Sequence, residues 1–78
     1  MSKREFLSEA ELTAFAKEVR KKAGIRRAQA ARDMGVSQTS IFHAEESPEQ
    51  SLAKLRARMI EAYSPFKVMG PVYHLEKK

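Results

Sequence analysis

Apolar residues recur at helical spacing along most of the chain, and each run is bounded by residues that favour a helix end. The first run consists of Leu12, Phe15, Ala16 and Val19, which share one stripe of a helix. Ser8 and Glu11 have the spacing of a capping box, in which each side chain bonds to the backbone amide of the other residue. Gly24 follows, and glycine readily adopts the left-handed conformation that ends a helix. The pattern predicts a first helix over about residues 9–23.

Two short helices are predicted next, separated by only a brief turn. The segment 27–34 is rich in alanine and ends before Gly35, which predicts a helix of about two turns. Ser37 can cap the helix that follows. On that helix Ile41 and Ala44 point to one side, and the opposite side is polar but hardly charged. The outward residues are Gln38, Thr39, Phe42 and His43.

A fourth helix is predicted from a second capping pattern. Ser47 is followed by Pro48, which suits the first helical position, and by Gln50 at the reciprocal position of a capping box. We expect the helix to begin there and to run to about Ala62. The inward stripe is Leu52, Leu55 and Met59, extended by Ile60 and Tyr63. The residues expected to stay in water are Lys54, Arg56 and Arg58.

Beyond Ser64 and Pro65 the sequence becomes rich in valine and aromatic residues. Gly70 and Pro71 exclude a helix there and confine any strand to the edge of a sheet. A lone strand is not stable, and the simplest partner is the same segment of a second chain. Residues 64–78 are therefore interpreted as a dimerisation arm, with a tail folded on the first helix as the alternative. The apolar side chains of the arm are Val68, Val72, Tyr73 and Leu75.

Together these elements predict a mostly all-α fold that ends in one short β-strand. The chain has 78 residues, which suits a single domain, with a helical core at residues 8–63 and the arm after it. A chain this short buries only about 60% of the surface that its unfolded form exposes. An apolar segment without a partner therefore suggests a second subunit.

The composition argues against several classes of protein. There is no cysteine, so disulfides, thiolate metal sites and cysteine nucleophiles are excluded, and two histidines cannot close a zinc site unaided. No nucleophile stands beside a base, so neither catalysis nor a cofactor is expected. No apolar run reaches the roughly 18 residues of a membrane span, and the opening MSKREF lacks the apolar stretch of a signal peptide. We therefore expect a cytoplasmic protein.

The net charge of +5 is unevenly distributed along the chain. Residues 12–33 hold seven basic and two acidic groups, and residues 52–78 hold six basic and two acidic ones. The stretch 34–51 between them contains three glutamates and no lysine or arginine. Two basic bands that flank a nearly neutral strip around Gln38 suit a phosphate polymer, whose backbone the bands would hold. The alternative is an ordinary solvated helix surface.

The two short helices separated by the turn GVS form a helix-turn-helix pattern. Ala31 is small where the two helices must approach, and Val36 and Ile41 can fill the angle between them. The stretch AGIRRAQAARDMGVSQTSIFHAEE, residues 23–46, resembles the DNA-binding domain of the phage repressor and Cro family. The resemblance covers about residues 12–60 and leaves both ends of the chain unmatched.

The resemblance implies that the third helix lies in the major groove of DNA, with its N-terminal residues on the base edges. Gln38 and Thr39 would then read bases, and Phe42 and His43 would extend the contact by one turn. The chemistry suits this role, because Gln can bond adenine through two hydrogen bonds and a Thr methyl can rest against a thymine methyl. For Phe42 the alternative is packing on the second helix or on the loop after the third. For His43 it is an ordinary surface position.

Phosphate contacts are expected near the start of the second helix. Members of the family place a polar cap and a glutamine there, where this chain has Arg26 and Arg27. Arginine caps a helix poorly, but a guanidinium at a helix N-terminus suits a phosphate. The expected phosphate ligands are Arg26, Arg27, Ser37 and Lys22. The resemblance also implies a structural ion pair between Arg20 and Glu45 that locks the third helix in place.

These features predict a transcriptional repressor that binds double-stranded DNA as a homodimer, on an operator with two half-sites about 34 Å apart. The alternative from another class is an antitoxin-type interaction module, which would bind a toxin as its protein partner and regulate its own promoter. RNA binding is less favoured, because single strands prefer an exposed aromatic platform and only Phe42 could supply one.

Overall fold

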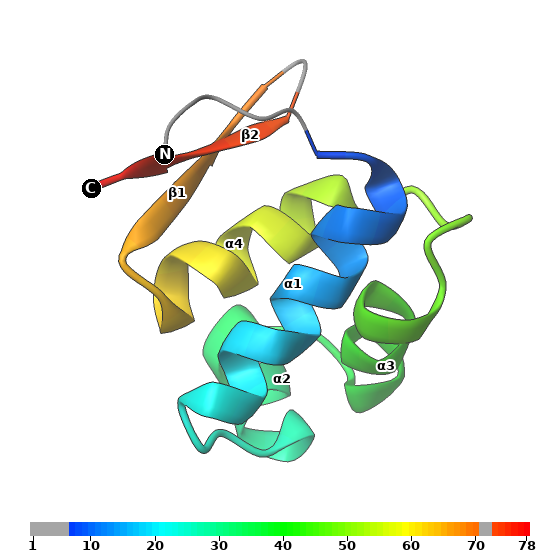
Figure 1. Cartoon of the computed structure of the whole chain (residues 1–78). Coiled ribbons are helices and arrows are strands. Elements are labelled where there is room, and N and C mark those ends of the chain that lie inside the picture. Colours follow the sequence, from blue (N-terminus) through cyan, green and yellow to red (C-terminus); the bar gives the residue numbers. More distant parts are fainter. Residues whose placement is uncertain (1–6, 71–72) are drawn as a thin grey trace.

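Four helices are followed by a two-stranded hairpin (Figure 1). The computed structural model of the chain describes residues 7–70 and 73–78. In chain order the elements are α1 (Glu9–Lys22), α2 (Arg27–Met34), α3 (Gln38–Glu46), α4 (Ala53–Tyr63), β1 (Phe66–Met69) and β2 (His74–Lys77). The prediction of a mostly helical fold with four helices is confirmed. No helix among the described residues has both the length and the apolar character needed to cross a membrane.

The first helix begins as its capping residues predict. The backbone N–H of Ser8 donates to Glu11 Oε1 over 2.8 Å, and the N–H of Glu11 donates to Ser8 Oγ over 3.1 Å. The helix ends at Lys22, and Gly24 follows with a φ of +74°, in the left-handed region that glycine tolerates. Local residues alone therefore determine both ends of α1.

Alanines supply part of the core. Ala16 of α1, Ala30 of α2 and Ala44 of α3 have no exposed surface, so each of these helices buries a position whose side chain is a single methyl group. In Figure 1, α1 crosses in front of α4, and α2 and α3 lie on the side of that pair away from the hairpin. The remaining buried apolar residues are Leu12, Val19, Ala31, Met34, Ile41, Leu55, Met59 and Ile60.

The predicted start of the fourth helix at Pro48 is wrong. Residues 47–52 form a turn instead, in which the Gln50 N–H donates to the Ser47 carbonyl over 3.0 Å. The Ser47 hydroxyl lies 3.0 Å from Nδ1 of His43, so it is engaged with α3 and does not cap α4. The helix begins only at Ala53, without a side-chain cap.

Arg56 explains why the turn persists, and its position corrects a second prediction. We expected Arg56 in water, yet it is completely buried. Its Nε donates to the Ala44 carbonyl (2.9 Å), its Nη2 to the Ser47 carbonyl (2.7 Å), and its Nη1 to the Gln50 carbonyl and to Glu9 Oε1 (both 3.1 Å). A side chain from α4 thus satisfies the carbonyls at the end of α3 and in the turn.

The other two cations of α4 lie closer to their expected positions. Lys54 is exposed, as predicted. Arg58 is exposed as well, but its Nη2 donates to the Met34 carbonyl over 2.8 Å. That carbonyl is at the C-terminal end of α2, where backbone acceptors lack partners within the helix. Two arginines of α4 therefore serve the ends of two neighbouring helices.

The C-terminal segment holds two strands rather than one, so the prediction of a lone strand is wrong. β1 and β2 pair antiparallel, with Val68 opposite Leu75 and Met69 opposite His74. Because the chain reverses after Gly70, the segment supplies its own partner strand. The need for a second chain, on which the interpretation as a dimerisation arm depended, therefore disappears.

The hairpin packs on the helices, which is closer to the alternative of a tail folded on the first helix. The ring of Phe66 lies 6.2 Å from that of Phe15 in α1, at a tilt of 58°. Val68, Tyr73 and Leu75, which we expected in a dimer contact, are partly buried against the core of their own chain. Val72, the fourth residue of that prediction, lies outside the described residues.

Replacing Arg56 by Met should lower the free energy of unfolding by about 2–4 kcal/mol, because the carbonyls that it satisfies would stay buried without donors. Lys54→Met removes an exposed cation from the same helix and should change that free energy by less than about 0.5 kcal/mol. Denaturant titrations followed by circular dichroism would measure both effects. Equal stability of the two variants would contradict the role assigned to Arg56.

Candidate nucleic-acid interface

A tight turn sets α3 at an angle to α2. Gly35 has a φ of +72°, a conformation that side chains with a Cβ rarely adopt. The N–H of Val36 donates to the Ala31 carbonyl over 3.0 Å, which closes the end of α2. Ser37 then caps α3 through its hydroxyl, which accepts from the Ser40 N–H over 3.1 Å. The two helices are therefore joined by only three residues.

The first turn of α3 is its most accessible part. Gln38 and Thr39 are both exposed, and neither side chain has a hydrogen-bond partner among residues 7–70 and 73–78. The opposite side of the helix is buried through Ile41, Ala44 and Glu45. An amide and a hydroxyl thus point outward from a helix whose other face is packed, and both are available to a ligand.

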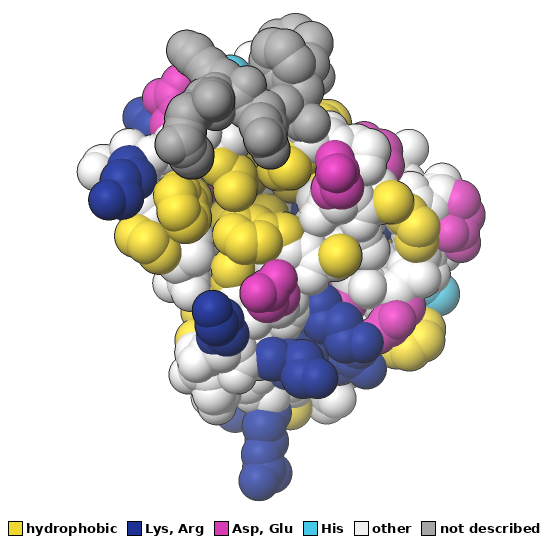
Figure 2. Space-filling view, viewed as in Figure 1, with side chains coloured by type: hydrophobic (Ala, Val, Ile, Leu, Met, Phe, Trp, Pro, Cys, Tyr) yellow, Lys and Arg dark blue, Asp and Glu magenta, His cyan; other side chains and the backbone are white. Residues whose placement is uncertain are grey.

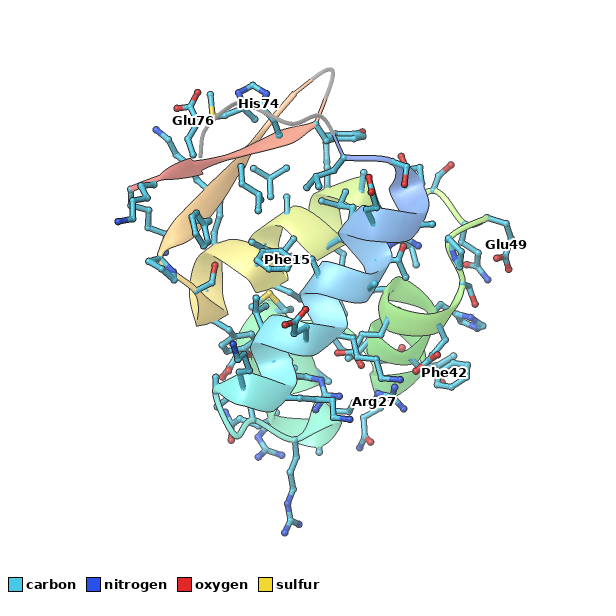
Figure 3. The ribbon with its side chains drawn as sticks, viewed as in Figure 1. Phe15, Arg27, Phe42, Glu49, His74 and Glu76 are labelled. Carbon is cyan, nitrogen blue, oxygen red and sulfur yellow. The ribbon has the colours of Figure 1, made fainter. Side chains whose placement is uncertain are left out.

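Phe42 lies outward one turn further along α3. It is exposed, as expected for a base contact, and it also packs on α2, as in the alternative interpretation. The residue is 44% exposed, and no other large hydrophobic residue in the described part of the chain is as accessible. The guanidinium carbon of Arg27 in α2 lies 5.2 Å from the ring centroid, so one face of the ring is covered (Figure 3). Phe42 is therefore held in one orientation while its ring stays accessible.

His43 is less available than predicted. Its ring meets that of Phe42 edge-on, with the centroids 5.4 Å apart. Its Nδ1 is bonded to the Ser47 hydroxyl, and the residue is only partly exposed. His43 therefore supports the turn after α3, and only the rest of its ring is open to a ligand.

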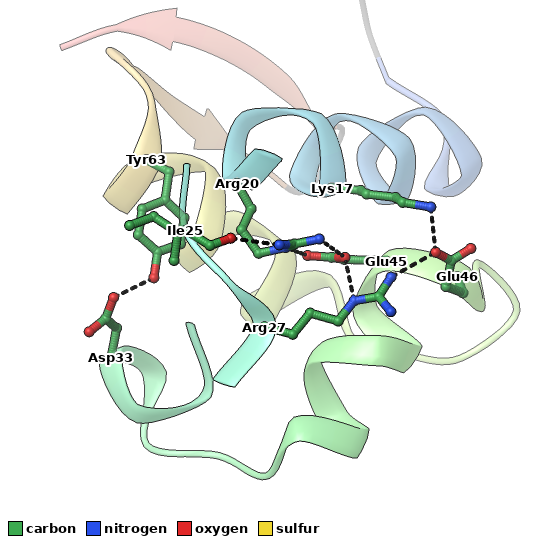
Figure 4. A network of polar contacts seen from close by, with 8 residues as sticks. All are labelled: Lys17, Arg20, Ile25, Arg27, Asp33, Glu45, Glu46 and Tyr63. Atoms are coloured by element: carbon green, nitrogen blue, oxygen red, sulfur yellow. Dashed lines mark hydrogen bonds and ion pairs between the residues drawn. The ribbon is translucent and has the colours of Figure 1, made fainter. Parts of the chain in front are cut away.

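The expected ion pair between Arg20 and Glu45 forms between α1 and α3 (Figure 4). Arg20 Nε donates to Glu45 Oε2 over 2.5 Å and Nη2 to Oε1 over 3.0 Å, a bidentate arrangement. Arg20 Nη1 also donates to the carbonyl of Ile25 over 2.6 Å. The Glu45 side chain has no exposed surface. Loss of either partner would leave a buried charge without its counter-charge, which is costly. The pair therefore holds α3 on α1.

Arg27, which we expected to contact phosphate, bonds to two glutamates of α3. Its Nε donates to Glu45 Oε1 over 3.0 Å and its Nη2 to Glu46 Oε2 over 2.8 Å. The same oxygen of Glu46 accepts from Lys17 Nζ over 2.6 Å. Lys17 and Glu46 were not among the predicted site residues. The sequence does place them near the predicted ion pair, because Lys17 lies one helical turn before Arg20 and Glu46 directly follows Glu45.

The remaining predicted phosphate ligands differ in their availability. Ser37 uses its hydroxyl as a helix cap. Arg26 occupies the N-cap position of α2 without making a capping bond, as expected of arginine, and is exposed. Lys21 and Lys22 are also exposed, and none of these three cations has a partner among the described residues. In Figure 2, Lys and Arg side chains gather at the end of the molecule where α1 ends and α2 begins.

A bond between Tyr63 and Asp33 braces α2 against α4. The Tyr63 hydroxyl donates to Asp33 Oδ2 over 2.6 Å. This bond, helped by one from Gln29, holds the pKa of Asp33 below its ordinary 3.8. Burial, together with the neighbouring carboxylate, raises the pKa of Tyr63 to about 12. The bond therefore persists across the neutral range and keeps the helix before the turn in place.

Comparisons of the chain with known protein families, with curated proteins and with solved structures found no match. Within residues 7–70 and 73–78, no group of three His, Asp or Glu side chains could hold a metal ion.

The hydrogen bond from Lys17, with smaller help from Arg27, holds the pKa of Glu46 below its ordinary 4.5. Because the pKa is lower in the folded state, the stabilisation is complete above about pH 4.5 and is lost as the pH falls through the folded-state pKa. Lys17→Gln should raise the pKa of Glu46, whereas Lys21→Gln, at an unpartnered lysine, should change it little. The side-chain carboxyl carbon of Glu46, followed by NMR during a pH titration, would measure this. A pKa insensitive to Lys17 would contradict the assigned cause.

Proposed function

We propose that this chain binds double-stranded DNA in a sequence-dependent manner, as a homodimeric transcriptional repressor that inserts α3 into the major groove. The observation that carries the proposal is the unpartnered pair Gln38 and Thr39 at the exposed start of α3. The other end of the same helix is fixed by the buried carboxylate of Glu45 and by Arg56. In helix-turn-helix proteins it is likewise the N-terminal residues of the second helix that contact the base edges.

The dimensions and chemistry of α3 suit the major groove. The groove is about 12 Å wide, and a helix with its side chains is about 10–12 Å across. Gln38 can donate to N7 and accept from N6 of adenine, and the methyl of Thr39 can rest against a thymine methyl. Both residues are uncharged, so they would select bases by hydrogen bonding and shape rather than by attraction to the backbone.

Cations at the end of α1 and the start of α2 would hold the DNA backbone. Arg26 and Lys22 are exposed near the start of α2 and the end of α1 and have no partner in the described part of the chain. Contacts from such residues to phosphates release counterions and contribute affinity without sequence preference. They would position the helix while Gln38 and Thr39 discriminate between sequences.

Selection of bound duplexes from a random pool tests the proposal directly, and recovery of one preferred sequence is the expected result. On that sequence Gln38→Ala should weaken binding by about 1–3 kcal/mol and relax the preference at one base pair. Arg26→Ala should weaken specific and random duplexes alike and reduce the salt dependence. Arg26 is preferred here to Arg27, because Arg27 also supports the structure. A pool that yields no preferred sequence, or equal losses for both variants on both duplexes, would refute the proposal.

The outer edge of the hairpin supports the homodimer. In an antiparallel pair, opposite residues alternate between those that bond to each other and those whose backbone groups point away from the partner strand. The Val68 N–H donates to Glu61 Oε2 of α4 over 3.3 Å, so Val68 and Leu75 do not bond to each other. The backbone groups of Leu75 therefore point away from β1. The backbone groups of Leu75 and of Lys77, two residues on, have no partner among the described residues. This edge of β2 can pair with the same edge of a second copy.

Lys77→Pro should convert the dimer to a monomer, because proline removes the outward N–H of β2 while leaving the bonds between β1 and β2 in place. Lys77→Gln removes the charge but keeps the N–H, and should remain dimeric. Sedimentation equilibrium would give the mass of each variant. If both variants have the mass of the unaltered protein, dimerisation through β2 is wrong.

A further inference from the structure

Two cations from different helices converge on one oxygen atom of Glu46. Lys17 Nζ in α1 lies 2.6 Å from Glu46 Oε2, and Arg27 Nη2 in α2 lies 2.8 Å from the same oxygen (Figure 4). The backbone of each donor is held within its helix, and the Arg27 side chain is also held by Glu45. The position of that oxygen is therefore a preformed anion site between two helices.

The two adjacent glutamates of α3 differ sharply in how firmly they are held. Glu45 is completely buried and receives both Arg20 and Arg27, so its carboxylate cannot leave without stranding charges. The Glu46 side chain is 33% exposed, and its partners Lys17 and Arg27 are 36% and 31% exposed. Exposed ion pairs contribute little to stability and exchange readily with other ions. Glu46 can therefore turn away into water while Glu45 keeps the helix in place.

The position of Glu46 in its helix also favours its displacement. Glu46 is the last residue of α3, where the partial negative charge of the helix end disfavours a carboxylate. A phosphate has more acceptor oxygens than a carboxylate and suits the planar fork of a guanidinium. Arg27 contacts Phe42 as well, so the anion site adjoins the outward face of α3. A DNA backbone that follows this face would pass within reach of both cations.

We propose that Lys17 and Arg27 form a binding site for a DNA phosphate, and that Glu46 occupies this site in the free protein as an internal competitor. The inference rests on the proposed DNA-binding function and adds a regulatory element to it. Glu46 lowers the affinity for every duplex by the same factor, since it competes with the backbone and not with the bases. It also reduces the salt dependence, because a carboxylate is released when the phosphate binds.

Glu46→Gln, compared with Glu49→Gln, separates this competition from the general effect of charge. Both variants raise the net charge by one, but Glu49 lies in the turn after α3 and makes no ion pair in the described chain (Figure 3). Relative to Glu49→Gln, Glu46→Gln should bind a random-sequence duplex about three- to tenfold more tightly and steepen the plot of log K against log salt by about one. Adding Lys17→Gln should abolish the extra gain. Equal affinities and slopes for the two single variants would overturn the inference.

A titration with inorganic phosphate distinguishes failure of this inference from failure of the proposed function. In Glu46→Gln, phosphate should shift the side-chain NMR signals of Lys17 and Arg27 more than in Glu49→Gln. If phosphate does so but no duplex binds either variant, the anion site stands and the DNA-binding function falls. If duplexes bind while phosphate leaves both signals unchanged, DNA binding stands and the competition by Glu46 is refuted. A circular dichroism spectrum like that of the unaltered protein would confirm that each variant is folded.

Discussion

The arrangement of the other elements depends on the hydrogen bonds of the Arg56 guanidinium, which is buried at the end of α3. Desolvating a charge is costly, and the cost is offset only if its donors meet well-placed acceptors. The Arg56 guanidinium donates four hydrogen bonds, three to backbone carbonyls and one to a carboxylate of α1. Because those acceptors belong to α1, α3 and the following turn, one side chain of α4 determines how all three lie together.

Because α3 is held at its C-terminal end, its two ends have different roles. The end near Arg56 and Glu45 carries the bonds that hold the helix, and the end at Gln38 carries side chains without partners. A rigid helix loses little freedom when it binds, so more of the interaction energy appears as affinity. The anchored end also places Arg27 between the buried Glu45 and the exposed Phe42. The same contacts that stabilise the fold therefore orient the surface proposed to meet DNA.

What the sequence could predict depended on whether a residue's partner was local. The capping box of Ser8 and Glu11 involves neighbours, and it was predicted correctly. The similar pattern at Ser47 failed, because the Ser47 hydroxyl bonds to His43, four residues earlier in α3, and its carbonyl accepts from Arg56, nine residues later. A capping pattern alone does not show that both groups are already engaged. The one-strand interpretation failed because Gly70 was taken to confine a strand rather than to let the chain turn back.

The candidate site was predicted in outline but not in its connections. The outward positions of Gln38 and Thr39 follow from helical periodicity, which a sequence displays directly. The engagement of Arg27 does not, since its carboxylate partners lie 18 and 19 residues away. Residues 12–33 contain seven cations, but the sequence does not show that three of them form ion pairs within the molecule. These three are Lys17, Arg20 and Arg27. The basic surface is consequently smaller than the composition suggests.

The complete burial of Ala16, Ala30 and Ala44 limits how this protein can vary. Alanine has no side-chain torsion, so the helices cannot absorb a bulkier residue at these positions by a change of rotamer, and overpacking would force them apart. Gln38 and Thr39 carry no such restriction, since both are exposed and neither side chain has a hydrogen-bond partner among the described residues. New ligand preferences can therefore arise on a scaffold whose shape stays constant, which makes this small domain a suitable starting point for combinatorial libraries randomised on one face of one helix.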